Sequence, residues 1–445
     1  MNRRLLGLLP DYLRVTARRE WQIALLTLVG LGPGVAVLTA WLNLAWLLQQ
    51  APDAGERHVG WLLPAFLLEP LGVAGVLVGT GVVTLLIGCL GLANAYLLSV
   101  ERRMPEFALL QGLGLRRRDV TALLLTESAV AGLVGVVTGV LGGVLLARAS
   151  WTAAQSYFDV AGPYHLAPAA LTAAGVTGFV AAMLFMGTSA AAEVTVAPMR
   201  LLRGERPLSP LRRWGERETS FYGAVYAAIL ALIGGAFVLP GRALGALVVL
   251  TLTLSVVLTV GGWLLARLYP RLPAPDRSIL WRMALQGLAR HPRHTAGLSL
   301  AMIAGAYGAG LAGLAVVAGP RPPLFPVWVA GGVLVAGAGL VLTAASLAAL
   351  ERRREYGLLV ALGARPSRVR RMILLEYGIV ALGGGGVGAL LALFNWALAG
   401  AGDWLIAVTV VFCDLLAALA SAGVGALPVL WRMARRAPGA ALREE

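Results

Sequence analysis

The sequence predicts an all-α polytopic membrane protein with about ten transmembrane helices. Of its 445 residues, 58% are apolar and only 13% are charged, whereas about a quarter of the residues of a soluble globular domain are charged. The mean hydropathy of +0.79 points the same way. The apolar residues gather in long runs, and clusters of arginine separate these runs. The lipid bilayer is therefore the first expected partner of the chain.

The apolar runs define the expected spans. A spanning helix needs about 20 residues, because about 30 Å of hydrocarbon must be crossed at a rise of about 1.5 Å per residue. The runs fall into groups of four, two and four, and the two central runs are joined so closely around Pro240 to Arg242 that they must form a hairpin. The expected ranges are 21–48, 71–99, 122–147, 168–192, 219–239, 243–267, 296–318, 325–350, 373–397 and 404–428.

The distribution of arginine predicts the orientation. Connections on one side hold the clusters, whereas the opposite connections hold only isolated arginines, such as Arg57, Arg242 and Arg321. Because cytoplasmic loops are rich in basic residues, we expect the clusters and both termini in the cytoplasm. No outer connection exceeds about 25 residues, and a folded domain needs at least about 50, so we expect no extracytoplasmic domain. The clusters are Arg3–Arg19, Arg102–Arg118, Arg200–Arg217, Arg267–Arg293, Arg352–Arg371 and Arg432–Arg443.

The charged and reactive residues exclude several classes of function. The net charge is +15, but membrane topology accounts for the clusters, so we expect no nucleic-acid partner. All 37 basic residues are arginine, which excludes a P-loop lysine and a Schiff-base lysine. The four histidines and two cysteines form no pattern typical of a metal site, and no acid, base and nucleophile cluster in the sequence. We therefore expect neither catalysis nor a bound metal in this chain.

An internal repeat organises the chain. The segment Arg102 to Arg116 recurs as Glu351 to Arg365, 249 residues later. A shorter pair, Pro198–Arg203 and Pro438–Arg443, closes each copy at an offset of 240 residues. Two intervening spans give both four-span copies the same orientation, which makes them parallel repeats. The expected parts are an amphipathic cytoplasmic helix at 1–20, the first repeat at 21–205, a linker and two-span hairpin at 206–275, and the second repeat with its own amphipathic helix at 276–445.

The repeated loop is the main candidate for a binding surface. Each copy has helical spacing of its apolar residues, and a glycine then takes the position that ends a helix. A solvated connector would explain one copy, but two matching copies favour a short helix whose apolar face needs a partner. Because no cytoplasmic domain is expected, that partner is another polypeptide. The candidate contact residues are Glu106, Leu109, Leu110, Gly114 and Arg116 in the first copy, and Glu355, Leu358, Leu359, Gly363 and Arg365 in the second.

The second loop carries a family resemblance. Glu351 to Ala364 reads ERRREYGLLVALGA and is followed by Arg365, by a span entered at Glu376 and by a closing Pro-x-x-x-Leu-Arg. This pattern resembles the FtsX-like permease domain of ABC transporters. The first copy departs from it, with Met104-Pro105 in place of two arginines and Ala108 in place of glycine.

The resemblance implies a function. It implies a permease subunit in a bacterial inner or plasma membrane, which couples ATP hydrolysis by a separate ABC-type ATPase to export or extraction of a lipophilic or peptide substrate. The repeated loops would contact that ATPase, and two loops suit two ATPase copies. ATP and Mg would bind to the ATPase, and this chain would bind no cofactor.

Three carboxylates fall inside the predicted spans. Asp414 lies deep in the last span, where an ionisable group costs about 2.5 to 3.5 kcal/mol, so it should face a cavity or a partner. Its counterpart at the offset of 240 is Ala174, so both a functional role and a structural hydrogen bond stay open. Glu127 and Glu376 do repeat, and we expect them either to pair with loop arginines or to snorkel. An ion-coupled secondary transporter that uses Asp414 is the alternative function.

Overall fold

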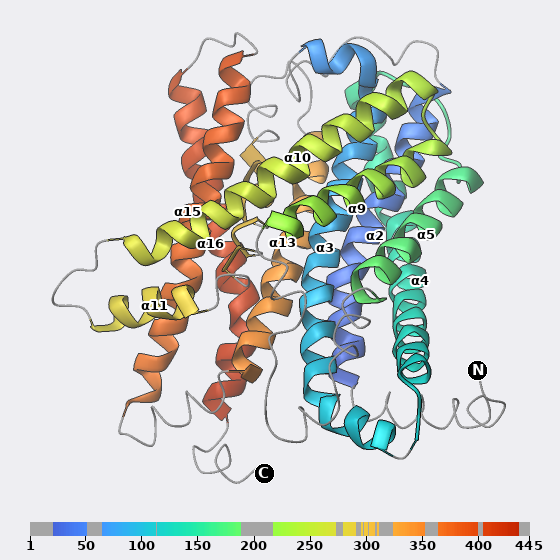
Figure 1. The fold of residues 1–445 in the computed structure, drawn as a ribbon. Helices are drawn as coiled ribbons and strands as arrows, with labels where there is room; N and C mark the ends of the chain where they lie inside the picture. The colour runs from blue at the N-terminus through green and yellow to red at the C-terminus, as the bar shows by residue number, and fades with distance from the viewer. Residues whose placement is uncertain are drawn as a thin grey trace.

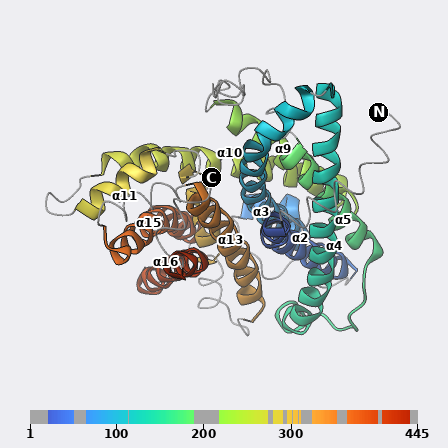
Figure 2. The same cartoon turned by 90° about the horizontal axis from the view of Figure 1, so that it is seen from below.

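The computed structural model confirms the all-α prediction within the residues that it describes. Every regular element there is a helix, and no β-strand occurs among them. The helices form two groups that lie side by side, with a helical hairpin running obliquely across them (Figures 1 and 2). The described residues are 21–50, 65–112, 114–187, 217–272, 279–290, 295–296, 298–300, 302–307, 309–310, 324–351, 364–398 and 404–435.

The first group is an up-and-down bundle built around α2. Its four helices are α2 (Trp21–Gln49), α3 (Ala65–Gly112), α4 (Arg117–Phe158) and α5 (Pro168–Ala182), which continues as a short π-helix, Met183–Gly187. Helix α2 packs against the other three, and its side chains from Leu31 to Leu48 are largely buried. The first span is therefore the core of the group.

The predicted central hairpin is confirmed. Helices α9 (Arg217–Ala236) and α10 (Gly241–Leu268) are joined by four residues, and α10 ends in a 3₁₀ turn, Tyr269–Arg271. The backbone N–H of Leu239 donates to the carbonyl of Gly235 at 2.7 Å and closes the turn. Helix α10 runs obliquely across the bundle and packs against both α3 and α15 (Figure 1).

The second group holds α13 (Leu324–Glu351), α15 (Pro366–Leu398) and α16 (Trp404–Arg435), together with the described parts of 295–310. The predicted amphipathic stretch ahead of it is α11 (Ile279–Arg290), which buries Leu285 and Leu288 against this group. Helix α13 packs on α16 and also on α2 and α3, so it joins the two groups (Figure 2).

Seven described helices are long and apolar enough to cross a membrane. Three shorter apolar helices, Ala224–Ala236, Leu298–Tyr307 and Val327–Gly339, lie within three further predicted ranges. The chain is thus a multi-pass membrane protein.

Two helices continue past the expected ends of their spans. We expected the third span to end near residue 147, but α4 continues to Phe158. Polar residues such as Arg148 and Gln155 lower the hydropathy of this extension, yet Trp151 and Tyr157 are buried on one side of it and keep it helical. Helix α3 similarly passes its expected end at 99 and runs to Gly112. Hydropathy located the spans, whereas packing beyond the hydrocarbon set where these helices end.

A glycine seam joins the third helix of the first group to the first helix. A Cβ atom built on Gly139 would lie 2.6 Å from the Cβ of Val35, and one on Gly135 would lie 2.9 Å from a methyl group of Leu31. Real Cβ atoms do not approach so closely, so only glycine allows α4 to lie this near α2. Small residues at such spacing are the usual means of close helix packing in lipid.

The second group repeats this seam in register. Gly135 and Gly139 correspond to Gly384 and Gly388, again 249 residues later. A Cβ on Gly384 would lie 2.7 Å from the Cβ of Met302, and one on Gly388 would lie 2.8 Å from the Cβ of Ala306. Met302 and Ala306 follow Leu31 and Val35 by a constant 271 residues. The two groups therefore share their helix contacts as well as their loop sequence.

Candidate functional site

The first repeated loop is the end of a long helix. We expected a separate short helix from Glu106 to Gly114, but the residues up to Gly112 belong to α3. Figure 1 shows this last part of α3, in cyan, turning sideways below the bundle toward the start of α4. Proline at position 105 of the sequence favours such a turn, because proline has no N–H to donate within a helix. We refer to residues 100–112 as the α3 foot.

The predicted glycine stop is confirmed. Gly114 has a φ of +98°, a conformation that suits glycine and strains other residues. Its N–H donates to the carbonyl of Gln111 at 3.0 Å, and the N–H of Leu115 donates to that of Leu110 at 3.2 Å. This bond pair is the Schellman closure with glycine at C′.

The next helix begins at once. Arg116 is extended, its N–H donates to the carboxylate of Asp119 at 3.3 Å, and its carbonyl accepts from the N–H of Asp119 at 2.9 Å. These bonds satisfy N-terminal groups of α4 that lack helical partners. The connection between α3 and α4 is therefore short and hydrogen-bonded.

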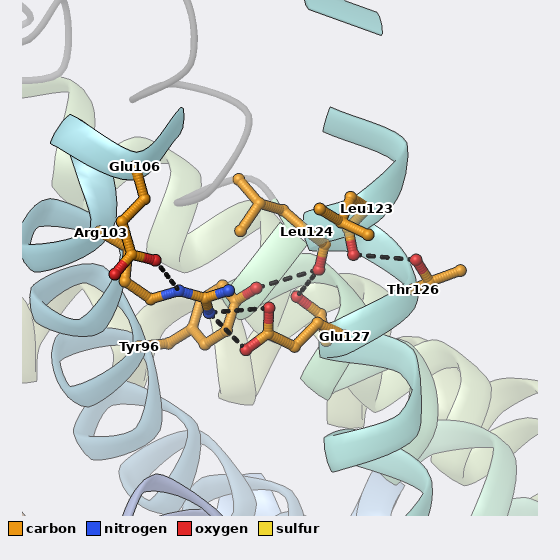
Figure 3. A network of polar contacts seen from close by, with 8 residues as sticks. Tyr96, Arg103, Glu106, Leu123, Leu124, Thr126 and Glu127 are labelled. Atoms are coloured by element: carbon orange, nitrogen blue, oxygen red, sulfur yellow. Dashed lines mark hydrogen bonds and ion pairs between the residues drawn. The ribbon is translucent and has the colours of Figure 1, made fainter. Parts of the chain in front are cut away.

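The inner face of the α3 foot is tied to α4 by an ion pair. The Nη1 of Arg103 donates to both carboxylate oxygens of Glu127, at 2.8 and 3.0 Å (Figure 3). The exposed fractions of the two side chains are only 7% and 14%. The guanidinium of Arg103 also lies 5.2 Å from the ring centroid of Phe107, which is buried. The ion pair with Glu127 and the contact with the Phe107 ring together fix the direction of the foot.

A second link lies beside this pair. The hydroxyl of Tyr96 on α3 donates to the carbonyl of Leu124 on α4 at 3.0 Å (Figure 3). The hydroxyl of Ser128 donates to the same carbonyl at 2.8 Å. All three residues are buried. Two polar links therefore join α3 to α4 near the foot.

The outer face of the foot is open. Leu109 is 60% exposed, and Glu106 and Arg116 are exposed beside it. Leu110, in contrast, is half-buried against the protein's own core. We had expected both leucines to face a partner, and of the two Leu109 is the more exposed. The helix phase explains the division, because Leu110 follows Arg103 and Phe107 by seven and three residues and so shares their inward face.

The second copy is described only in part. Arg365 is exposed just ahead of α15, and Glu376 is buried within α15. Glu355, Leu358, Leu359 and Gly363 lie outside the described residues. Glu376 follows Glu127 by the repeat offset of 249, and Arg352 and Tyr356 follow Arg103 and Phe107 by the same offset. The expected pairing of Glu127 with a loop arginine is confirmed, and that arginine is Arg103. The sequence analysis did not single out Phe107, which the shared register could have indicated.

The third intramembrane carboxylate lies far from the foot. Asp414 is buried within α16, and neither of its oxygens has a hydrogen-bond partner among the described residues. Among all the residues that the structure describes, no group of three His, Cys, Asp or Glu residues could hold a metal ion.

Comparison with known proteins identifies the family. The FtsX-like permease C-terminal domain matches the chain twice, at residues 78–193 and 327–438, which together make just over half of it. The chain belongs to the FtsX-like permease family. Each match includes one copy of the repeated loop and the span that follows it. Members of this family are typically membrane subunits without catalytic activity of their own.

A relative supports this assignment. A protein of Methanocaldococcus jannaschii described as an uncharacterized ABC transporter permease is 34% identical over 79 residues. The match spans 18% of this permease and 20% of the relative. The similarity is therefore confined to about a fifth of either chain.

Proposed function

We propose that this permease is the membrane subunit of an ABC transporter that couples ATP hydrolysis by a separate ATPase to export or extraction of a lipophilic or peptide substrate. The observation that carries the proposal is the α3 foot, which presents Leu109 outward while an ion pair ties its inner face to α4. An exposed leucine between charged side chains suits a groove on a partner protein. Family membership supplies the class of that partner, an ATPase with a conventional P-loop.

The contacts support a path for the motion. Force on Leu109 moves the foot, and Arg103 passes it to Glu127 on α4 because charged groups bonded at 2.8 Å resist separation. Helix α4 in turn packs closely against α2 along the glycine seam. Because the packing there is tight, a shift of α4 would move α2 as well. The second copy would use Leu358, Arg352 and Glu376 in the same way, by the repeat offset.

The proposed topology has ten spans arranged as four, two and four, with the arginine-rich ends and both termini in the cytoplasm. The start of α4 and the start of α15 lie at one end of the bundle, as do the start of α2 and the end of α16 (Figure 1). Two repeated loops suit two ATPase subunits on a single permease chain, with ATP and Mg bound by those subunits. Family membership favours this assembly over an ion-coupled secondary transporter.

Copurification tests the proposal. The tagged permease, extracted from its own cells into mild detergent, should retain a P-loop ATPase, identified by mass spectrometry, with two copies per permease by native mass. Leu109→Asp should release it, because a carboxylate placed in an apolar groove costs several kcal/mol.

Leu166→Asp is the matched control. Leu166 is also an exposed leucine, at 46%, but it lies beyond the other end of α4 from the foot. Retention of the ATPase by Leu109→Asp, or its equal loss from both variants, would contradict the proposed contact.

A further inference from the structure

Asp414 is a buried carboxylate that the coupling path does not use. Only 4% of the residue is exposed, and both oxygens lack a hydrogen-bond partner among the described residues. A Cβ atom built on Gly310 would lie 3.1 Å from Oδ2 of Asp414 and 2.8 Å from the Cβ of Ala392. The carboxylate therefore sits where α16 meets α15 and the helix that contains Gly310.

The same place in the first group is filled differently. Gly178 on α5 and Ala418 on α16 are 240 residues apart and occupy equivalent contacts, since Gly178 approaches Val136 and Ala418 approaches Gly385. That register makes Ala174 the counterpart of Asp414, and the seam register makes Thr39 the counterpart of Gly310. The second group therefore has a smaller residue, Gly310, where the first group has Thr39, and a larger residue, Asp414, where the first group has Ala174.

Volume alone does not explain an acid. Valine or leucine would fill the space left by Gly310 at no electrostatic cost, whereas an ionisable group in a span costs about 2.5 to 3.5 kcal/mol. Such groups persist where they bind something. The exchange has placed a carboxylate at one of two equivalent positions, so the second group alone gains a polar site.

No cation of the protein is available to this carboxylate from the surrounding spans. Residues 301–320 contain no charged residue, and residues 377–398 of α15 contain none either. Helix α13 is free of charge until Glu351 at its end, and α16 itself carries no basic residue before Arg432. Tyr307 and Cys413 are the titratable groups nearest in these segments, and neither carries a positive charge. An ionised Asp414 would therefore need a counter-ion from outside these helices.

The site lies at a depth that a membrane-dissolved molecule can reach. Asp414 is the eleventh residue of α16, about 15 Å from the start of the helix and thus near the middle of about 30 Å of hydrocarbon. Phe412 and Leu416, two residues on either side of it, are 62% and 51% exposed and face outward. Helix α16 therefore has exposed apolar side chains on one side and the buried carboxylate on the other.

We propose that Asp414 binds the cationic group of a lipophilic cation that enters from the bilayer. The carboxylate supplies the opposite charge in a medium of low dielectric, where an ion pair is far stronger than in water. The ring of Tyr307, which packs beside Ala392 and Val410, offers an aromatic face for the same cation. That this cation is the transported substrate rests on the proposed permease function, whereas its binding at Asp414 does not.

Binding of two ions of one shape tests the site. The purified permease alone, in nanodiscs of a neutral lipid, is titrated with tetraphenylphosphonium and with tetraphenylborate, and bound ion is measured by equilibrium dialysis against empty nanodiscs. The wild type should bind the cation and not the anion. Asp414→Asn and Asp414→Ala should each weaken cation binding at least about tenfold. Alanine already occupies the equivalent place in the first group, so the second variant should fold.

Asp159→Asn is the matched control for loss of a carboxylate. Asp159 is exposed at the end of α4 with a φ of +59°, which asparagine also adopts, so this variant should bind the cation as the wild type does. Equal binding by all variants, or equal uptake of tetraphenylborate, would overturn the proposal and leave an adventitious partition into lipid. Loss of the ATPase with Asp414-dependent binding intact would instead remove only the permease function.

The converse variant adds a gain of function. Thr39→Gly with Ala174→Asp copies the site into the first group and should raise the number of cations bound per permease from one to two. An unchanged number in a folded double variant would mean that the carboxylate and the space beside it do not suffice, which also overturns the proposal.

Discussion

The pair of Arg103 and Glu127 gives the sharpest test of how the α3 foot is held. Glu127→Gln removes the negative charge and leaves a cation with 7% of its side chain exposed. Breaking a buried pair from one side costs about 3 to 5 kcal/mol, and the partial exposure of Glu127 favours the lower end. A loss of about 3 kcal/mol changes the equilibrium between docked and undocked foot about 100-fold.

Hydrogen exchange measures that equilibrium directly. In nanodiscs, amides of the α3 foot should exchange about 100-fold faster in Glu127→Gln, with little change in α10. Glu106→Gln is the matched control, because Glu106 lies 4.0 Å from Nε of Arg103 and its side chain is 47% exposed, so its loss should cost less than about 1 kcal/mol.

The double replacement completes the cycle. Arg103→Met with Glu127→Leu removes both charges and should recover most of the protection, because an apolar pair leaves no charge without a partner. Equal effects of Glu106→Gln and Glu127→Gln, or no effect of either, would refute the account of the foot.

Three further predictions concern close packing and helix ends. Gly139→Ala should destabilise the permease by about 1 to 3 kcal/mol, because the new methyl would lie 2.6 Å from the Cβ of Val35. Gly142→Ala should be tolerated, because its methyl would lie 3.6 Å from the Cβ of Ala36. Thermal unfolding in detergent compares the two variants. Gly114→Ala should raise exchange in the foot and lower ATPase coupling, because its φ of +98° strains alanine by about 1 to 2 kcal/mol, whereas the helical Gly112→Ala should not. Asn43→Leu should lower the melting temperature, because the amide oxygen of Asn43 accepts from the buried N–H just ahead of α5 at 2.8 Å and its loss costs about 1 to 3 kcal/mol. A milder effect than that of the neighbouring exposed variant Thr172→Val would contradict this last assignment.

Hydropathy and glycine chemistry made much of the fold predictable. The helical hairpin followed from the lack of chain between two apolar runs, and the end of the α3 foot followed from the preference of Gly114 for a positive φ. Both depend on neighbours in sequence. The repeat offset of 249 was also visible, and it reaches into the glycine seam at Gly135 and Gly139.

Features that depend on distant neighbours were not predictable. Leu109 and Leu110 are alike in sequence, and only the packing of α3 on α4 decides that one faces outward and the other inward. The correspondence of Leu31 with Met302 could not be read from the sequence either. The two residues make equivalent contacts with Gly135 and Gly384 but differ in residue type. Helix α4 extends beyond its apolar run because Tyr157 packs against an aromatic residue of α13, Phe325, with the ring centroids 5.8 Å apart.

Photocrosslinking in the native membrane tests the central claim most directly. A photoreactive phenylalanine analogue at position 109 should crosslink to a P-loop ATPase, and the same analogue at position 166 should not. ATP with vanadate should change the yield at position 109, because the coupling account requires the contact to follow the nucleotide state. A permease that crosslinks to no ATPase from position 109, or equally from both positions, would contradict the assignment of the α3 foot as the coupling surface.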